Sequence, residues 1–187
     1  MIFDRILSPE ESGQVLAQLQ ALQTFESFHA RALVQDRDRV EQWHIEVDRA
    51  GEAWFATAEH GHVEEFRGGV RFDRGEVFQL PAKLADFLPP AIKPAFPETL
   101  GWWGEHDHGY RPVLVERVGR KSMLLTFEHG SDPAMRSTMV FDTELGIVTR
   151  TIGFDSATLL VDIEPGKPIE RHVPASFPEL EVIYPDY

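Results

Sequence analysis

The sequence predicts an α+β fold in which a strongly curved antiparallel β-sheet, a half-barrel of about ten strands, wraps around an N-terminal helix and a proline-rich apolar lid segment. Three observations predict it. A capped amphipathic helix covers residues 8–24. Short strand-like runs separated by turn residues cover 26–80 and 111–184. An irregular apolar stretch, 81–103, lies between these two meanders. We expect residues 1–187 to form a single domain, since a chain of this length buries roughly 70% of its unfolded surface.

The helix is predicted by the stretch "SPEESGQVLAQLQALQ". Ser8 is a favoured N-cap residue, Pro9 suits the first helical position, and Glu11 completes an S-x-x-E capping box. The apolar residues that follow recur at helical spacing: Val15, Leu16, Leu19 and Leu22.

The strands are predicted by short runs rich in aromatic and β-branched residues. Six such runs extend from "SFHARALVQ" to "EVFQLP", and five more extend from "RPVLVERVG" to "ATLLVDIEPG". "FPELEVIYPDY" would add a final edge strand. Connections this short join antiparallel neighbours, because a parallel crossover needs a dozen residues or more. A sheet of this size must curl to bury one face.

Alternation within two runs assigns side chains to faces. Met139 and Phe141 are expected to share one face of their strand. Leu159, Val161 and Ile163 are likewise expected to share one face. Residues 142–146 ("DTELG") are typical of a tight hairpin turn that ends in a left-handed glycine.

The apolar segment 81–103 interrupts the two meanders. A short helix is expected from residue 81 to residue 88, where Pro89 and Pro90 must end it. Long irregular connections are uncommon unless they cover something. Two interpretations stay open: the segment is a lid over a hydrophobic cavity, or its side chains complete a filled core.

Composition excludes several classes of protein. The chain has no cysteine, so disulfides, thiolate metal sites and a lipidated N-terminal cysteine are excluded. A formal charge of −13 argues against nucleic acid and anionic membrane surfaces as partners. A mean hydropathy of −0.26 is ordinary for a soluble protein.

No apolar run reaches the roughly 18–20 residues of a transmembrane helix. The N-terminus shows neither a signal peptide nor a lipobox, so we expect a cytoplasmic protein as written, and an extracytoplasmic one only if a signal was removed.

The order of elements resembles the lipoprotein-carrier fold, the LolA-like group that includes the N-terminal domain of the RseB/MucB regulators. Three stretches carry the resemblance: the opening helix running into "SFHARALVQ", the paired strands of "RPVLVERVGRKSMLLTFEH", and "STMVFDTELGIVTRTIGFD", with a D-x-x-x-G turn before a strand that bears Arg150. The resemblance covers about residues 8–165. It implies an unclosed curved sheet whose concave face holds acyl chains or other apolar ligands.

The resemblance therefore implies a non-enzymatic binding protein for an apolar or amphipathic, lipid-like ligand, without a cofactor. The lid would move away from the concave face, and burial of apolar surface would drive association. Arg150 would meet a ligand carboxylate or phosphate at the rim, but pairing with the plentiful carboxylates of the solvent face is the simpler explanation for it. The expected ligand-binding residues are Phe66, Phe72, Phe78, Phe87, Leu88, Trp102, Trp103, Leu125, Phe127 and Arg150.

Two alternatives come from other features. The acidic surface suits a cytoplasmic interaction module with a filled core that engages a basic protein partner. Two His-x-His pairs, His60 with His62 and His106 with His108, would suit a metal-binding protein if a third ligand converged on them. Solvent-facing imidazoles explain the same pairs, so no metal is assigned to them. The nucleophile-elbow and phosphate-loop motifs are absent, and no catalytic residue is expected.

Overall fold

The computed structural model describes residues 4–22, 26–79, 88–100 and 109–166. The expected helix from residue 81 and the expected final strand in "FPELEVIYPDY" lie outside the described residues, apart from Leu88. Within the described ranges, no helix combines the length and the hydrophobicity needed to cross a membrane.

The described strands form one twelve-stranded sheet in which every neighbouring pair is antiparallel. Their order is β1-β8-β9-β10-β11-β12-β2-β3-β4-β5-β6-β7, with β1 and β7 at the two edges, so the sheet is not closed into a barrel. The bounds are β1 (Arg5–Ile6), β2 (Ser27–Asp36), β3 (Arg39–Asp48), β4 (Ala53–Ala58), β5 (Val63–Arg67), β6 (Val70–Asp73), β7 (Glu76–Gln79), β8 (Tyr110–Arg117), β9 (Ser122–His129), β10 (Arg136–Asp142), β11 (Ile147–Ile152) and β12 (Ser156–Pro165).

The predicted antiparallel sheet is confirmed, with more strands than the expected ten. The two-residue β1 was not expected from the sequence. It pairs with β8, where Arg5 faces Val115 and Ile6 faces Leu114. Two residues are too few to show an alternating pattern, so only the pairing partner reveals this strand.

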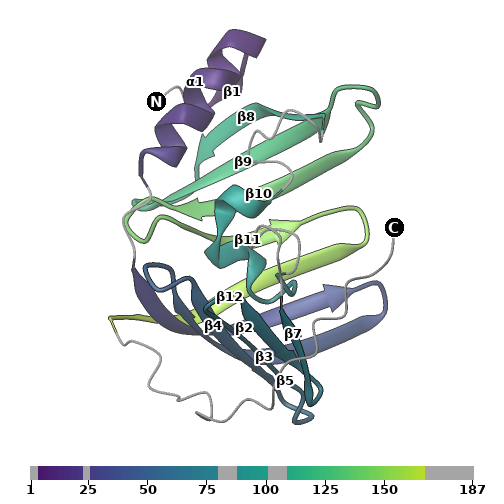
Figure 1. The fold of residues 1–187 in the computed structure, drawn as a ribbon. Coiled ribbons are helices and arrows are strands. Elements are labelled where there is room, and N and C mark those ends of the chain that lie inside the picture. The colour runs from purple at the N-terminus through teal and green to yellow at the C-terminus, as the bar shows by residue number, and fades with distance from the viewer. Residues whose placement is uncertain (1–3, 23–25, 80–87, 101–108, 167–187) are drawn as a thin grey trace.

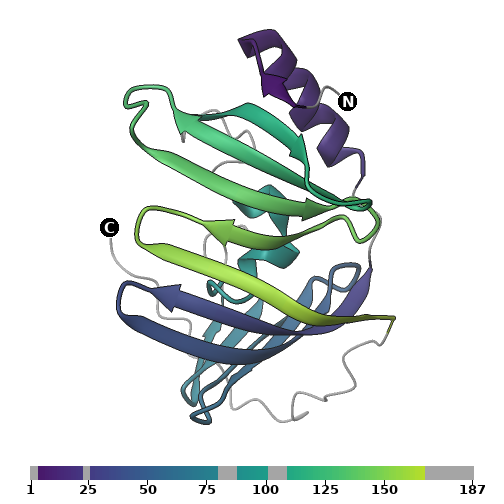
Figure 2. The same cartoon turned by 180° about the vertical axis from the view of Figure 1, so that it is seen from behind.

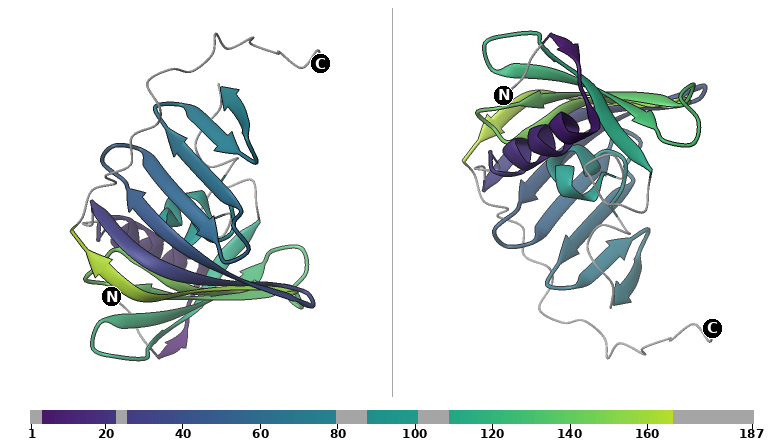
Figure 3. Two further views of the ribbon diagram at one scale, coloured as in Figure 1. Left: turned by 90° about the horizontal axis from the view of Figure 1, so that it is seen from below. Right: turned by 90° about the horizontal axis from the view of Figure 1, so that it is seen from above.

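The sheet bends, and the helical elements lie on the inside of the bend. Strands β4 to β7 stand at a steep angle to the layer formed by β8 to β12 (Figure 3). Figure 1 shows α1 (Pro9–Gln20) over β8 and β9, and the short helical turns near the middle of the sheet. In Figure 2, seen from behind, the strands pass in front of the short helical turns, and α1 remains visible beside β8 at one end of the sheet. The curved sheet around helical elements therefore agrees with the predicted fold class at this level.

Helix α1 begins as the sequence predicts. Ser8 is the N-cap, and the reciprocal hydrogen bonds of the capping box with Glu11 are present. The helix ends at Gln20, with Ala21 as C-cap, and so is shorter than the expected 8–24. The Ser12 hydroxyl, buried against the sheet, lies 2.6 Å from the Pro112 carbonyl oxygen of β8. This bond fixes α1 to the strand that it covers.

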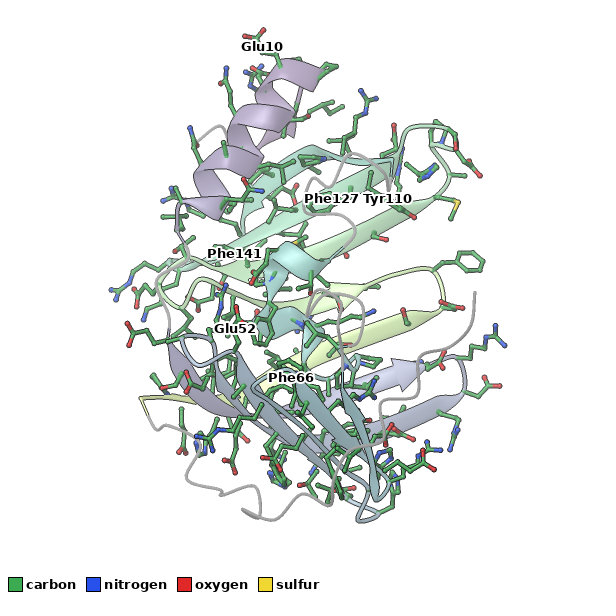
Figure 4. The ribbon with its side chains drawn as sticks, viewed as in Figure 1. Glu10, Glu52, Phe66, Tyr110, Phe127 and Phe141 are labelled. Carbon is green, nitrogen blue, oxygen red and sulfur yellow. The ribbon has the colours of Figure 1, made fainter. Side chains whose placement is uncertain are left out.

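The core has two clusters. The first joins strands β2 to β5 to residues 88–96 and contains Phe28, Trp43, Ile45, Trp54, Phe66, Leu88, Ile92 and Phe96, among others. The second joins α1 to strands β8 to β11 and contains Val15, Leu19, Leu100, Leu125, Phe127, Met139 and Phe141, among others. Figure 4 places Phe127 and Phe141 in the upper half of the molecule and Phe66 in the lower half. The inner face of the bend therefore has two separate apolar centres.

Side-chain alternation holds in β10 and fails in β12. Met139 and Phe141 are both fully buried on the same face, as predicted. In β12 the prediction is wrong for Ile163, which packs against the first cluster. The register shifts between Val161 and Glu164, and Asp162 has a positive φ of 52°. This bulge moves Ile163 to the face opposite Leu159 and Val161, because an extra residue reverses the alternation.

Replacement of Ile92 tests the packing of the first cluster. Ile92 is fully buried, so we expect Ile92→Ala to lower the free energy of unfolding by about 2–5 kcal/mol in urea denaturation. The matched control is Phe154→Ala, since Phe154 is 96% exposed and its loss should change stability by less than about 0.5 kcal/mol. Equal effects of the two changes would contradict this packing.

The N-terminal carboxylate of α1 gives a pH-dependent prediction. The Ser8 backbone N–H donates to Glu11 at 2.8 Å and is the main cause that holds the pKa of Glu11 below 4.5, with a further contribution from the Arg5 guanidinium. Because the folded-state pKa is lowered, this stabilisation is present above pH 4.5 and is lost as the pH falls through the folded-state pKa. An NMR titration of Glu11 should give a midpoint below 4.5. Arg5→Ala should raise that midpoint, and a midpoint at or above 4.5 in the parent protein would contradict the capping geometry.

Candidate ligand-binding groove

The described part of the predicted lid, residues 88–100, is called the inner segment here. It contains two 3-10 helical turns, η2 (Lys93–Ala95) and η3 (Pro97–Thr99). Prolines at 89, 90, 94 and 97 lack the N–H group that a longer helix or a central strand would need. Short turns closed by bonds such as Ala95 N–H to the Ile92 carbonyl (2.9 Å) satisfy the N–H groups of Ile92, Lys93, Ala95, Phe96, Thr99 and Leu100.

One side of the inner segment is buried against the sheet. Ala91, Ile92, Ala95 and Phe96 are each at most 2% exposed and belong to the first core cluster. Leu100, at the other end, belongs to the second cluster. The inner segment therefore connects the two apolar centres of the bend.

Arg49 holds the inner segment from the β3–β4 turn. Its Nη2 atom donates to both carboxylate oxygens of Glu98, at 3.1 and 3.0 Å, and its guanidinium lies 5.7 Å from the centre of the Phe96 ring. Its Nη1 atom lies 3.5 Å from the Gly146 carbonyl oxygen in the β10–β11 turn. The Arg49 side chain is 13% exposed, so these charge-assisted bonds are partly screened from water. Arg49 thus fastens the inner segment to two turns of the sheet.

A groove of about 300 Å³ lies between the inner segment and the sheet. Its volume is at the lower limit of ordinary small-molecule pockets, roughly 300–1,000 Å³. The sheet supplies one wall and residues 90–100 supply the other. The lining residues are Val34, Gln35, Asp36, Pro90, Lys93, Pro94, Thr99, Leu100, Thr151, Ser156 and Thr158.

The sheet wall of the groove is a row of side chains across three strands. Thr151 of β11 faces Thr158 of β12, and Thr158 faces Val34 of β2. All three are buried on the inner face. Two hydroxyl groups and one apolar side chain in a row give this wall both hydrogen-bonding and apolar character.

The opposite wall has a similar mixture. Pro94 and Leu100 are buried and apolar, and Thr99 donates its hydroxyl to the Phe96 carbonyl at 2.8 Å. Lys93 is exposed and contributes a positive charge, whereas Asp36 on the sheet contributes a negative one. The groove can therefore hold an apolar group between walls that also offer hydroxyl groups and a cation.

The residues predicted for ligand binding lie in different places. Phe66 and Leu88 are buried in the first cluster, and Leu125 and Phe127 in the second. They do not line the groove. Phe72 is 36% exposed on β6 and borders a separate depression.

The other predicted residues fall on the outer face or outside the described part. Arg150 is exposed and precedes Thr151, whose side chain lines the groove, so Arg150 points to the outer face. Phe87, Trp102 and Trp103, with His106 and His108, lie outside the described residues, as does the side chain of Phe78. Whether the predicted set binds a ligand stays a prediction.

Sequence reasoning missed the groove hydroxyls and Arg49. The strand register brings Thr151 and Thr158 together, and the packing of the inner segment places Lys93 in the same groove. The residues around Arg49 give no indication that its partner, Glu98, lies 49 positions further along the chain. The one available signal was the interruption of apolar alternation by Thr151 and Thr158.

The comparisons with known proteins concern the fold. No family model matches the chain, and no curated protein matches it. Among solved structures it is similar to the crystal structure of MucB, with a TM-score of 0.49 and 17% sequence identity, over 87% of this chain and 61% of that chain. The chain therefore spans about 61% of the length of that relative. The similarity to MucB, a protein of the group that the sequence resembles, is a coarse likeness of fold.

Loss of the Arg49 contacts should loosen the inner segment. We expect Arg49→Ala to raise hydrogen–deuterium exchange of the amides of residues 92–100 roughly tenfold, since a bond to a charged group contributes about 1.5–3 kcal/mol. Arg39→Ala is the matched control, because Arg39 is exposed and lies 3.8 Å from its partner Glu41. Unchanged exchange of these amides in Arg49→Ala would show that the contacts do not hold the segment.

Proposed function

We propose that this protein is a non-enzymatic binding protein for an amphipathic, lipid-like ligand, which enters the groove between the inner segment and the curved sheet. The observation that carries the proposal is the groove itself, whose walls combine buried apolar side chains with hydroxyl groups and an exposed lysine. Concave sites of this mixed composition are typical of small-molecule binding.

The chemistry of the lining suggests how such a ligand would lie. Its apolar part would contact Val34, Pro94 and Leu100, from which burial removes water. Its acidic head group would lie near Lys93, and the hydroxyls of Thr151 and Thr158 would bond its polar atoms. A carboxylate or a phosphate on a short acyl chain meets all three requirements.

The size of the groove limits the ligand. A volume of about 300 Å³ equals about ten water molecules at roughly 30 Å³ each, which suits a short chain or the end of a longer one. A longer chain would require the inner segment to move away from the sheet. Arg49 would then control access, because its bonds to Glu98 hold that segment in place. This movement is the lid displacement expected from the sequence.

A second candidate function is an acidic interaction module for a basic protein partner. Two observations favour it: the clusters on the inner face are packed with fully buried side chains, and the chain carries a formal charge of −13. Such a protein would bind through its outer surface and would not need the groove.

Calorimetric titration with decanoic acid tests the groove. We expect one binding site, and we expect Lys93→Glu to weaken binding roughly tenfold, because an attractive charge pair becomes a repulsive one. Lys121→Glu is the matched control: it makes the same charge change at the β8–β9 turn, outside the groove. Decanol, which has no charge, should bind Lys93→Glu and the parent protein equally.

Two results would count against the groove. Absence of decanoate binding to the parent protein would favour the interaction module. Equal weakening by Lys93→Glu and Lys121→Glu would mean that decanoate responds to net charge and not to a site beside Lys93.

A further inference from the structure

A second group of polar side chains lies on the inner face of β5 and β6, away from the groove residues. His62 precedes β5, Glu64 is in β5, and Arg71 and Asp73 are in β6. The register brings them together, because Glu64 faces Asp73 and Phe66 faces Arg71. The four side chains are at most 24% exposed, and that of Glu64 is 8% exposed.

Three of these side chains direct one ligand atom each to a common point. His62 Nε2 lies 3.0 Å from Asp73 Oδ1 and 3.4 Å from Glu64 Oε1. All three ligand atoms lie within 4.8 Å of one another. Ligands bound to one metal at about 2.0–2.2 Å with tetrahedral or octahedral angles are themselves about 3.0–3.5 Å apart. The two separations from His62 Nε2, one of which is also a hydrogen-bond distance, therefore match those between ligands of one metal ion.

Arg71 holds the other oxygens of the same two carboxylates. Its Nη2 atom donates to Glu64 Oε2 at 2.7 Å and to Asp73 Oδ2 at 3.3 Å. This leaves Glu64 Oε1 and Asp73 Oδ1 directed at the imidazole. Outer hydrogen bonds of this kind orient metal ligands. With a neutral imidazole, the two carboxylates and the Arg71 guanidinium sum to a charge of −1, and the exposed Arg74 guanidinium, 3.8 Å from Asp73 Oδ1, is a competing cation that a bound metal ion would displace.

The imidazole is fixed on its other side and is reached from solvent. The Trp43 ring lies 5.4 Å from the His62 ring and 6.5 Å from that of His60. An open depression of about 510 Å³, bordered by His60, His62, Val63, Phe72 and Arg74, borders the imidazole. An ion would reach the cluster past His62, the one of the three ligands that lines this depression.

We propose that His62, Glu64 and Asp73 bind one divalent first-row transition metal ion of the Zn²⁺ class, with Arg71 as the residue that positions the two carboxylates. One nitrogen and two carboxylate oxygens form a ligand set that suits Zn²⁺, Mn²⁺ or Co²⁺. The site is separate from the proposed groove, so its test does not depend on ligand binding there.

Calorimetric titration of chelator-treated protein with ZnCl₂ tests the site. We expect one Zn²⁺ per chain, and we expect His62→Ala and Asp73→Asn each to weaken binding by at least about tenfold. Asp73→Asn keeps the shape of the side chain, so it tests the site even if His62→Ala fails to fold. His44→Ala is the matched control, since His44 is exposed on β3, which β4 separates from β5, and the variant should bind Zn²⁺ like the parent protein.

A Co²⁺ titration followed by visible absorption provides the second readout. Ligand-field bands should appear in the parent protein and in His44→Ala, and should be lost in Asp73→Asn. Arg71→Met should weaken Zn²⁺ binding by about 10–100-fold without abolishing these bands at saturation. Failure of the parent protein to bind Zn²⁺, or equal affinity in the parent, His62→Ala and Asp73→Asn, would overturn the proposal and leave the cluster as a network of ion pairs.

Discussion

The packing of residues 88–100 into the bend of the sheet is the interaction on which the rest of the structure depends. Burial of one Ile or Phe side chain stabilises a fold by about 1.5–3 kcal/mol, and here Ile92 and Phe96 bury theirs between strands that lie at a steep angle to each other. Leu100 extends the contact to the second cluster beneath α1. Without this segment the two apolar centres of the inner face would be more exposed, and the sheet, whose two edges are open, would keep only its β-bulges and α1 to support its curvature among the described residues.

The same segment creates the groove. Its prolines prevent it from joining the sheet as a strand, so it meets β2, β11 and β12 through side chains only. Side chains pack tightly around Ile92. Near Lys93 and Thr99 the sheet has Thr151 and Thr158 instead of larger apolar residues, and the space of the groove lies there. Arg49 adds a polar fastening at Glu98. These hydrogen bonds lie between Phe96 of the first cluster and Leu100 of the second, so breaking them would loosen the segment near Glu98 while the rest remains folded.

Local features of the fold were predictable from the sequence, and long-range ones were not. The capping box depends on Ser8 and Glu11, which are three positions apart. The turn after Asp142 is equally local, because the Asp142 carboxylate accepts from the amides of Glu144 and Leu145. The bulge at Asp162 reversed the predicted face of Ile163, because alternation gives no sign of an inserted residue. The His62 cluster depends on the β5–β6 register, and the Arg49 contact on a fold that brings residues 49 and 98 together. The aromatic residues predicted as a ligand site were apolar enough to serve as core, and those described in the two clusters are buried there.

Native mass spectrometry of freshly purified protein tests the central claim, that the space between the inner segment and the sheet holds an amphipathic ligand. The account predicts one additional lipid-sized mass per chain, which is lost on denaturation and is restored when the refolded protein is incubated with decanoic acid. A bare chain mass both as purified and after incubation would contradict the account, and would leave the packed inner face without a ligand to bind.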